Sequence, residues 1–151
     1  MLLFVYGSLK EGFPNHHVNR GRRVPGTFRT VVPYPFYLAD GVLPCLLPSP
    51  GSGHRVLGQL FEVGEPELAA MDLLERVGEP GGYARHTIEV EPVDAAAATA
   101  AAGLGDGAAE AGRPVITAFV YMQSDSRLAN GGQHIGPIAE YTPEHARSLR
   151  W

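Results

Sequence analysis

The chain has 151 residues with a formal net charge of −4, and 44% of them are hydrophobic against 19% charged. This length and composition predict one globular domain, spanning residues 1–151, with a substantial core. The sequence lacks the clustered Lys and Arg on which nucleic-acid binding depends, so nucleic acid is excluded as a partner. The apolar run at residues 2–5 is too short for a signal-peptide core, and no segment reaches the roughly 20 apolar residues of a membrane span. We therefore expect a cytoplasmic protein without membrane contact.

Strands predominate among the elements that the sequence predicts. The β-branched or aromatic-rich runs are separated by Gly and Pro at spacings that suit an antiparallel, barrel-like sheet, and they lie at residues 2–6, 27–32, 36–39, 56–63, 84–93 and 115–122. One strong helix is predicted in "EPELAAMDLLERV", with Pro66 at its first position and with Gly78 and Pro80 ending it. A second, short helix is predicted after Thr142 as N-cap, with Pro143 just inside.

The segment "DAAAATAAAGLGDGAAEAG" differs in composition from the rest of the chain. It is mostly Ala and Gly between two predicted strands, and its glycines dilute the helix propensity of alanine. We expect a mobile surface loop inserted at about residues 94–113. It could be a linker without function, a lid or an assembly contact.

Several reactive side chains do not form a recognisable metal or nucleophile motif. Cys45 lies in an apolar segment and is expected to be a small core residue rather than a reactive thiol. His16 and His17 lack the spacing of metal ligands, which favours a structural or substrate-edge role. Ser8 lacks the glycine pattern of a nucleophile elbow or a P-loop. We therefore expect neither a metal nor a cofactor.

Glu75 occupies an unusual place on the predicted helix. Leu68, Met71 and Leu74 form an apolar stripe, and at about 100° per residue Glu75 falls about 20° from Leu68, inside that stripe. A carboxylate placed toward the core must be paired, hydrogen-bonded or protonated, and its pKa rises with desolvation. This pattern suits a proton-transfer residue, but a structural ion pair with Arg85 would satisfy it equally well.

The first predicted strand ends in Tyr6-Gly7-Ser8. Gly7 allows the backbone to turn tightly or to approach a ligand, and the amides that follow can point at a carboxylate or an oxyanion. This loop could therefore form the second half of a small-molecule site.

A family resemblance joins these features. In order and spacing, the chain resembles the γ-glutamylcyclotransferase superfamily, above all γ-glutamylaminecyclotransferase and its bacterial relatives, in the motifs "FVYGSLKEGFPNHH", "PYPFYLADG", "LLPSPGSGHRVLGQLFEV", "MDLLE" and "YARHTIEV". The resemblance implies an α+β fold, a small mixed, mainly antiparallel β-barrel with one or two flanking helices. It also implies a loop that holds the γ-glutamyl head group, formed here by Tyr6, Gly7, Ser8 and Leu9.

The resemblance further implies that Glu75 is the catalytic acid/base, with Met71 in place of the family's usual leucine. The substrate's own α-amino group would attack its γ-carbonyl and release 5-oxoproline, so a γ-glutamyl small molecule is the expected partner, and the protein would be a monomer or weak homodimer. Tyr83 and Tyr121 are candidate pocket walls or hydroxyl donors, or simply half-buried strand aromatics. A non-catalytic ligand-binding relative and a protein-interaction module remain alternatives.

The leaving amine is constrained only by the cations near these motifs. Lys10, Arg20, Arg22 and Arg23 lie in a polar loop context and are expected to be solvated. Without a cation to bind a second α-carboxylate, we expect γ-glutamyl amines to be preferred over γ-glutamyl-α-amino acids.

Overall fold

The first strand, β1 (Leu2–Val5), is apolar on both faces. The computed structural model describes residues 1–7, 10, 21–39, 41, 43–80, 82–104, 115–124 and 134–147. Because successive strand side chains point to opposite faces, Phe4 and Tyr6 join one core cluster while Leu3 and Val5 join another. The strand therefore separates two apolar layers, one inside the sheet and one outside it.

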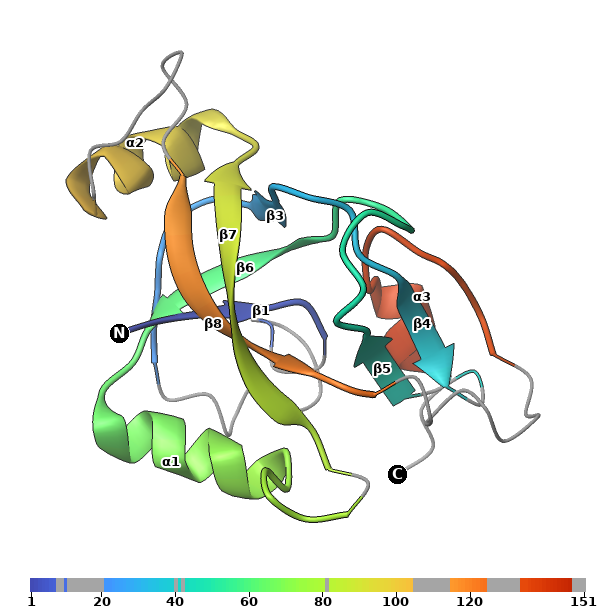
Figure 1. The fold of residues 1–151 in the computed structure, drawn as a ribbon. Helices are drawn as coiled ribbons and strands as arrows, with labels where there is room; N and C mark the ends of the chain where they lie inside the picture. The colour runs from blue at the N-terminus through green and yellow to red at the C-terminus, as the bar shows by residue number, and fades with distance from the viewer. Residues whose placement is uncertain are drawn as a thin grey trace.

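Five strands close into a barrel (Figure 1). Following the pairing from β1, the ring runs through β8 (Ile116–Met122), β7 (Ala84–Pro92), β3 (Phe28–Thr30) and β6 (Leu57–Glu62), and β6 pairs with β1. The β1–β8 pairing is parallel, and the other pairings of the ring are antiparallel. The expected mixed, mainly antiparallel α+β barrel is thus confirmed.

In the described part of the chain, three further strands lie outside this ring. The two-residue strand β2 (Arg22–Arg23) extends the sheet at β6. The strands β4 (Phe36–Ala39) and β5 (Leu43–Leu46) form a separate two-stranded sheet. Residues 22–23 and 43–46 were not predicted as strands, whereas β4 was predicted with its observed bounds. Cys45 is fully buried on β5, which confirms its place in the core.

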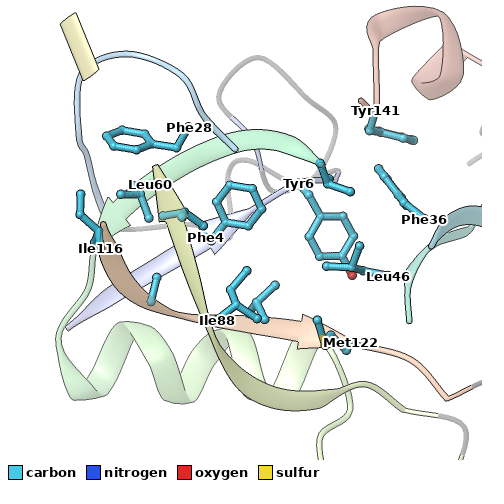
Figure 2. Packing of buried hydrophobic residues seen from close by; sticks show 14 of the residues in the cluster. Phe4, Tyr6, Phe28, Phe36, Leu46, Leu60, Ile88, Ile116, Met122 and Tyr141 are labelled. Atoms are coloured by element: carbon cyan, nitrogen blue, oxygen red, sulfur yellow. The ribbon is translucent and has the colours of Figure 1, made fainter. Parts of the chain in front are cut away.

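The interior of the barrel is filled by aromatic and branched side chains. Figure 2 shows Phe4, Tyr6 and Ile88 lying between the strands, with Phe28 and Leu60 toward one end. At the other end Tyr6 meets Phe36 edge to face, with ring centroids 5.0 Å apart. Tyr6, the first residue of the Tyr6-Gly7-Ser8 motif, therefore lies at this second end of the barrel.

Helix α1 (Glu65–Leu74) covers the outer face of β1. Its first turn is capped by the Glu67 carboxylate, which accepts a hydrogen bond of 2.9 Å from the Gly64 N–H. Leu68 and Met71 pack into the outer apolar cluster, but Leu74 is 37% exposed. The predicted helix is confirmed, and its buried stripe is shorter than expected.

Helix α2 (Ala95–Leu104) corrects the expectation of a surface loop for these ten residues. Its first turn is capped by Asp94, whose carboxylate accepts hydrogen bonds from the N–H groups of Ala97 (2.8 Å) and Thr27 (3.1 Å). Ala97 and Ala101, one turn apart, are fully buried in the barrel core. Residues 105–114 lie outside the described part of the chain.

Helix α2 lies beyond the end of β7 and the start of β8 (Figure 1). Its position depends on a close backbone approach. Gly26 has φ +93, and a Cβ at this position would lie 2.2 Å from the backbone nitrogen of Ala97. Only glycine fits both the dihedral angle and the contact. The helix therefore plugs one end of the barrel with small side chains.

The C-terminal helix α3 (Pro143–Arg147) begins directly after Thr142, as predicted. Tyr141, which precedes it, is fully buried and lies near Phe36 in Figure 2. None of the helices in the described ranges is long and apolar enough to cross a membrane.

Candidate active site

The end of α1 fixes the backbone of Glu75. Its N–H donates to the Met71 carbonyl at 2.9 Å, which completes the last turn of the helix. Arg76 then adopts a left-handed conformation with φ 57, which stops the helix. The carbonyl of Glu75 accepts a 2.9 Å hydrogen bond from the Tyr83 N–H. Glu75 is therefore held between the helix and the segment that leads into β7.

The Glu75 carboxylate is half-buried, and burial raises its pKa from 4.5 to about 7. Among the described residues it forms neither a hydrogen bond nor an ion pair. The alternative ion pair with Arg85 is absent, because the Arg85 guanidinium contacts the Asp72 carboxylate at 2.7 Å instead. Glu75 thus has the properties of a proton-transfer group rather than of half a structural salt bridge.

Tyr6 brings the strand–loop motif close to this carboxylate. Its hydroxyl donates to the backbone carbonyl of Tyr121 at 2.5 Å. Burial, and then the negative charge of Glu75, raise the pKa of Tyr6 well above its ordinary value. Burial, and then the hydrogen bond to Asp72, raise the pKa of Tyr121, and the negative charge of Glu75 raises it by a smaller amount. The acid and the start of the loop therefore share one electrostatic environment.

Gly7 lies where the backbone of the loop passes β5. A Cβ at this position would lie 3.2 Å from the Cβ of Pro44, which is tighter than an ordinary contact. The Gly7 carbonyl accepts a 3.1 Å hydrogen bond from the Lys10 N–H. Ser8, Leu9, His16 and His17 lie outside the described residues, so their expected roles stay predictions.

Tyr83 and Tyr121, the other two candidate site tyrosines, border the same region, but their hydroxyl protons are already donated within the protein. The Tyr83 hydroxyl donates to the Pro44 carbonyl at 2.5 Å, and the Tyr121 hydroxyl donates to Asp72 at 2.6 Å. A phenol carries a single proton. In this arrangement Tyr6, Tyr83 and Tyr121 can line a pocket or accept hydrogen bonds, but none offers a proton to a ligand.

Lys10 was expected in solvent, and this expectation is wrong. Its side chain is buried, and Nζ donates to the Tyr141 carbonyl at 2.5 Å. Burial lowers the pKa of Lys10 to about 8. Lysine in a polar sequence context gives no sign of burial, because its partner lies 131 residues away in the chain.

Asp72 and Arg85 are polar neighbours of the site that the motifs did not single out. Asp72 lies within the quoted "MDLLE" and Arg85 within "YARHTIEV", but their pairing depends on how α1 packs on the barrel. The only sequence signal is spacing, since Asp72 precedes Glu75 by one helical turn.

Comparison with known proteins identifies the family. A family model described as "Gamma-glutamyl cyclotransferase, AIG2-like" matches residues 3–138. The chain belongs to this family. Its fold agrees with that of an AIG2-like protein from Mus musculus, whose crystal structure superposes with a TM-score of 0.72 at 28% identity, covering 99% of this chain and 93% of that one.

Curated members of the cyclotransferase family are also similar in sequence. The gamma-glutamylaminecyclotransferase of Bos taurus is 42% identical over 94 residues, which cover 58% of this chain and 55% of the relative. The gamma-glutamylaminecyclotransferase of Homo sapiens is 41% identical over 96 residues, which cover 60% and 61%. The chain thus spans less than two thirds of the length of either relative. The resemblance stated from the sequence motifs is confirmed at the level of the family.

Proposed function

We propose that the protein is a γ-glutamylaminecyclotransferase, which converts a γ-glutamyl amine into 5-oxoproline and a free amine. The observation that carries this proposal is the half-buried Glu75, whose carboxylate has no partner among the described residues and whose pKa is about 7. Membership of the cyclotransferase family and the names of the curated relatives support the choice of reaction.

The reaction needs a proton acceptor that also serves as a donor. Glu75 takes a proton from the substrate's α-ammonium group, and the resulting amine attacks the γ-carbonyl carbon to form the new C–N bond of the five-membered ring. Glu75 returns this proton to the leaving nitrogen as the original amide C–N bond breaks, and it then carries the second proton of the new ring nitrogen to the released amine, which leaves as an ammonium ion. A pKa of about 7 leaves both protonation states populated at neutral pH, which suits one group to both steps.

The nucleophile belongs to the substrate, so the protein mainly has to bind it in a folded conformation. Orientation of this kind is worth several kcal/mol. Because the hydroxyl protons of Tyr6, Tyr83 and Tyr121 are already donated within the protein, we assign head-group binding to backbone N–H groups of the loop at Tyr6, Gly7, Ser8 and Leu9. These donors would bind the α-carboxylate or stabilise the oxyanion, and Tyr83 and Tyr121 would line the walls.

A non-catalytic relative that binds a small amino-acid-like ligand is the alternative function. It would retain the barrel and the loop. The raised pKa of Glu75 favours catalysis over this alternative, because binding alone does not require a desolvated carboxylate with both protonation states populated.

The test is incubation of the purified protein with a panel of γ-glutamyl amides, with products identified by mass spectrometry. We expect equal amounts of 5-oxoproline and free amine. Release of glutamate would instead indicate hydrolysis, and ligand binding without any product would support the non-catalytic alternative.

A further inference from the structure

Two side chains on neighbouring barrel strands contact the same carboxylate of α1. Arg85 on β7 and Tyr121 on β8 are directly opposite each other in the antiparallel pairing. Arg85 Nη1 lies 3.0 and 2.7 Å from the two carboxylate oxygens of Asp72, and the Tyr121 hydroxyl donates to Oδ1 of Asp72 at 2.6 Å. We call these three residues the Asp72 clamp.

The Asp72 clamp is itself anchored to the barrel. The Arg85 guanidinium lies over the Phe119 ring, 5.0 Å from its centroid, which restricts where the cation can move. Tyr121 is buried in the outer apolar cluster beside Met71 of α1. The two groups that hold Asp72 are therefore themselves held in place by contacts with the barrel and with α1.

Asp72 lies three residues before Glu75, so the clamp acts on the turn of the helix that carries the candidate acid/base. Tyr121 also has a second role, because its backbone carbonyl accepts the Tyr6 hydroxyl at 2.5 Å. Tyr121 thus contacts the end of α1 through its side chain, and through its backbone it contacts Tyr6, the start of the loop at Tyr6, Gly7, Ser8 and Leu9. We call this segment the head-group loop.

We propose that the Asp72 clamp is a positioning device that sets Glu75 relative to the head-group loop. The inference rests on the proposed cyclotransferase function. In that reaction one carboxylate must reach two substrate nitrogens in turn, and small displacements of a catalytic group cost large factors in rate. Asp72 and Arg85 are positioning residues that act through Glu75. Tyr121, a wall of the proposed pocket, also acts as a positioning residue through its hydroxyl on Asp72 and its carbonyl on Tyr6.

The two hydrogen bonds of Tyr121 can be removed separately by mutation. Tyr121→Phe removes the hydroxyl bound to Asp72 but keeps the carbonyl bound to Tyr6. We expect kcat for 5-oxoproline release to fall about 10-fold with KM within about twofold of wild type. Tyr6→Phe removes only the tie to the loop, and we expect its main effect on KM.

Thr30→Val is the matched control. Thr30 is fully buried on β3; its hydroxyl donates to the Val32 carbonyl at 2.6 Å and accepts from the Val56 N–H at 3.0 Å, and neither bond involves α1. This variant loses a buried hydroxyl away from Glu75 and should retain wild-type kcat and KM. A Tyr121→Phe protein with wild-type kcat, or with a loss no larger than that of Thr30→Val, would overturn the proposal.

Backbone amide hydrogen exchange tests the Asp72 clamp without a measurement of enzyme turnover. The amides of Glu75 and Tyr83 are hydrogen-bonded to Met71 and Glu75, so they report on the last turn of α1. We expect Tyr121→Phe to speed their exchange about 10-fold relative to Thr30→Val at matched global stability. Unchanged exchange would contradict the clamp. If the wild-type protein releases no 5-oxoproline, the proposed function fails and the exchange result alone decides whether the clamp holds Glu75.

Discussion

At the scale of single residues, Glu75 couples stability to pH. Its pKa in the folded protein is about 7 against an ordinary 4.5, because burial disfavours the charged form. Between these two values the folded state binds more protons than the unfolded state, so stability falls as the pH rises through this window. Below about pH 4 Glu75 is protonated in the folded and the unfolded state, so its ionisation no longer lowers the stability of the fold.

The variant Glu75→Gln should therefore be more stable than wild type at pH 8 and equally stable at pH 4. We expect a gain of about 1–3 kcal/mol at pH 8, since each pKa unit corresponds to about 1.4 kcal/mol. Urea unfolding at the two pH values measures it. Glu79→Gln is the control, because Glu79 is 54% exposed and only its surface pair with Arg76 would be lost. A Glu75→Gln protein that is less stable than wild type at pH 8 would contradict the desolvated carboxylate.

At the scale of elements, α2 shows how small side chains close the barrel. Ala97 and Ala101 are fully buried, whereas their neighbours Ala98 and Ala102 are exposed. The Asp94 cap and the glycine at position 26 set the helix directly on the barrel end.

Ala101→Asp should destabilise the protein by at least about 2 kcal/mol, because it buries a carboxylate among apolar side chains. The matched variant Ala102→Asp places the same residue one position along, on the exposed side of α2, and should stay within about 0.5 kcal/mol of wild type. Thermal unfolding compares the two, with a shift of about 2–4 °C expected per kcal/mol for a chain of this size. Equal melting temperatures would mean that α2 does not seal the core.

The same elements show what the sequence could predict. The β-branched runs and the capped α1 were recognisable because their patterns are local, and the helical period placed Glu75 toward the core. Strand β5 was not predicted because Pro44 argues against a strand. Among the described strands β5 pairs with β4 alone, and a proline is tolerated at such an edge position. Helix α2 was not predicted because its buried face consists of alanine methyl groups, which give almost no amphipathic signal in the sequence.

At the scale of the whole molecule, the candidate site is assembled from distant parts of the chain. Tyr6 and Tyr121 are hydrogen-bonded across 115 residues, and Tyr83 reaches Pro44 on the separate β4–β5 sheet. Motifs could name these residues, but they could not show that the tyrosine hydroxyls bind within the protein. That result follows only from barrel closure.

Substrate choice should reflect the cations near this assembled site. Among the described residues, Arg85 is bound to Asp72 and Lys10 to the Tyr141 carbonyl. We expect kcat/KM for γ-glutamyl-ε-lysine to exceed that for γ-glutamyl-alanine by about 10-fold or more. The carboxylate of γ-glutamyl-alanine lies one carbon from the leaving nitrogen and would find neither cation available, whereas that of γ-glutamyl-ε-lysine lies at the far end of the lysine chain. Parallel assays of the two substrates measure the ratio. A preference for γ-glutamyl-alanine would point to another carboxylate-binding residue, and Arg20, Arg22 and Arg23 would be the first to mutate.

The most direct measurement of the central claim is the rate of 5-oxoproline release by wild-type protein and by Glu75→Gln, on the same γ-glutamyl amine. Gln keeps the size and polarity of the side chain but cannot transfer the proton. We expect the folded variant to bind the substrate with similar affinity and to turn it over about 10²–10⁴ times more slowly. A folded Glu75→Gln protein that releases 5-oxoproline at a near wild-type rate would show that Glu75 is not the acid/base.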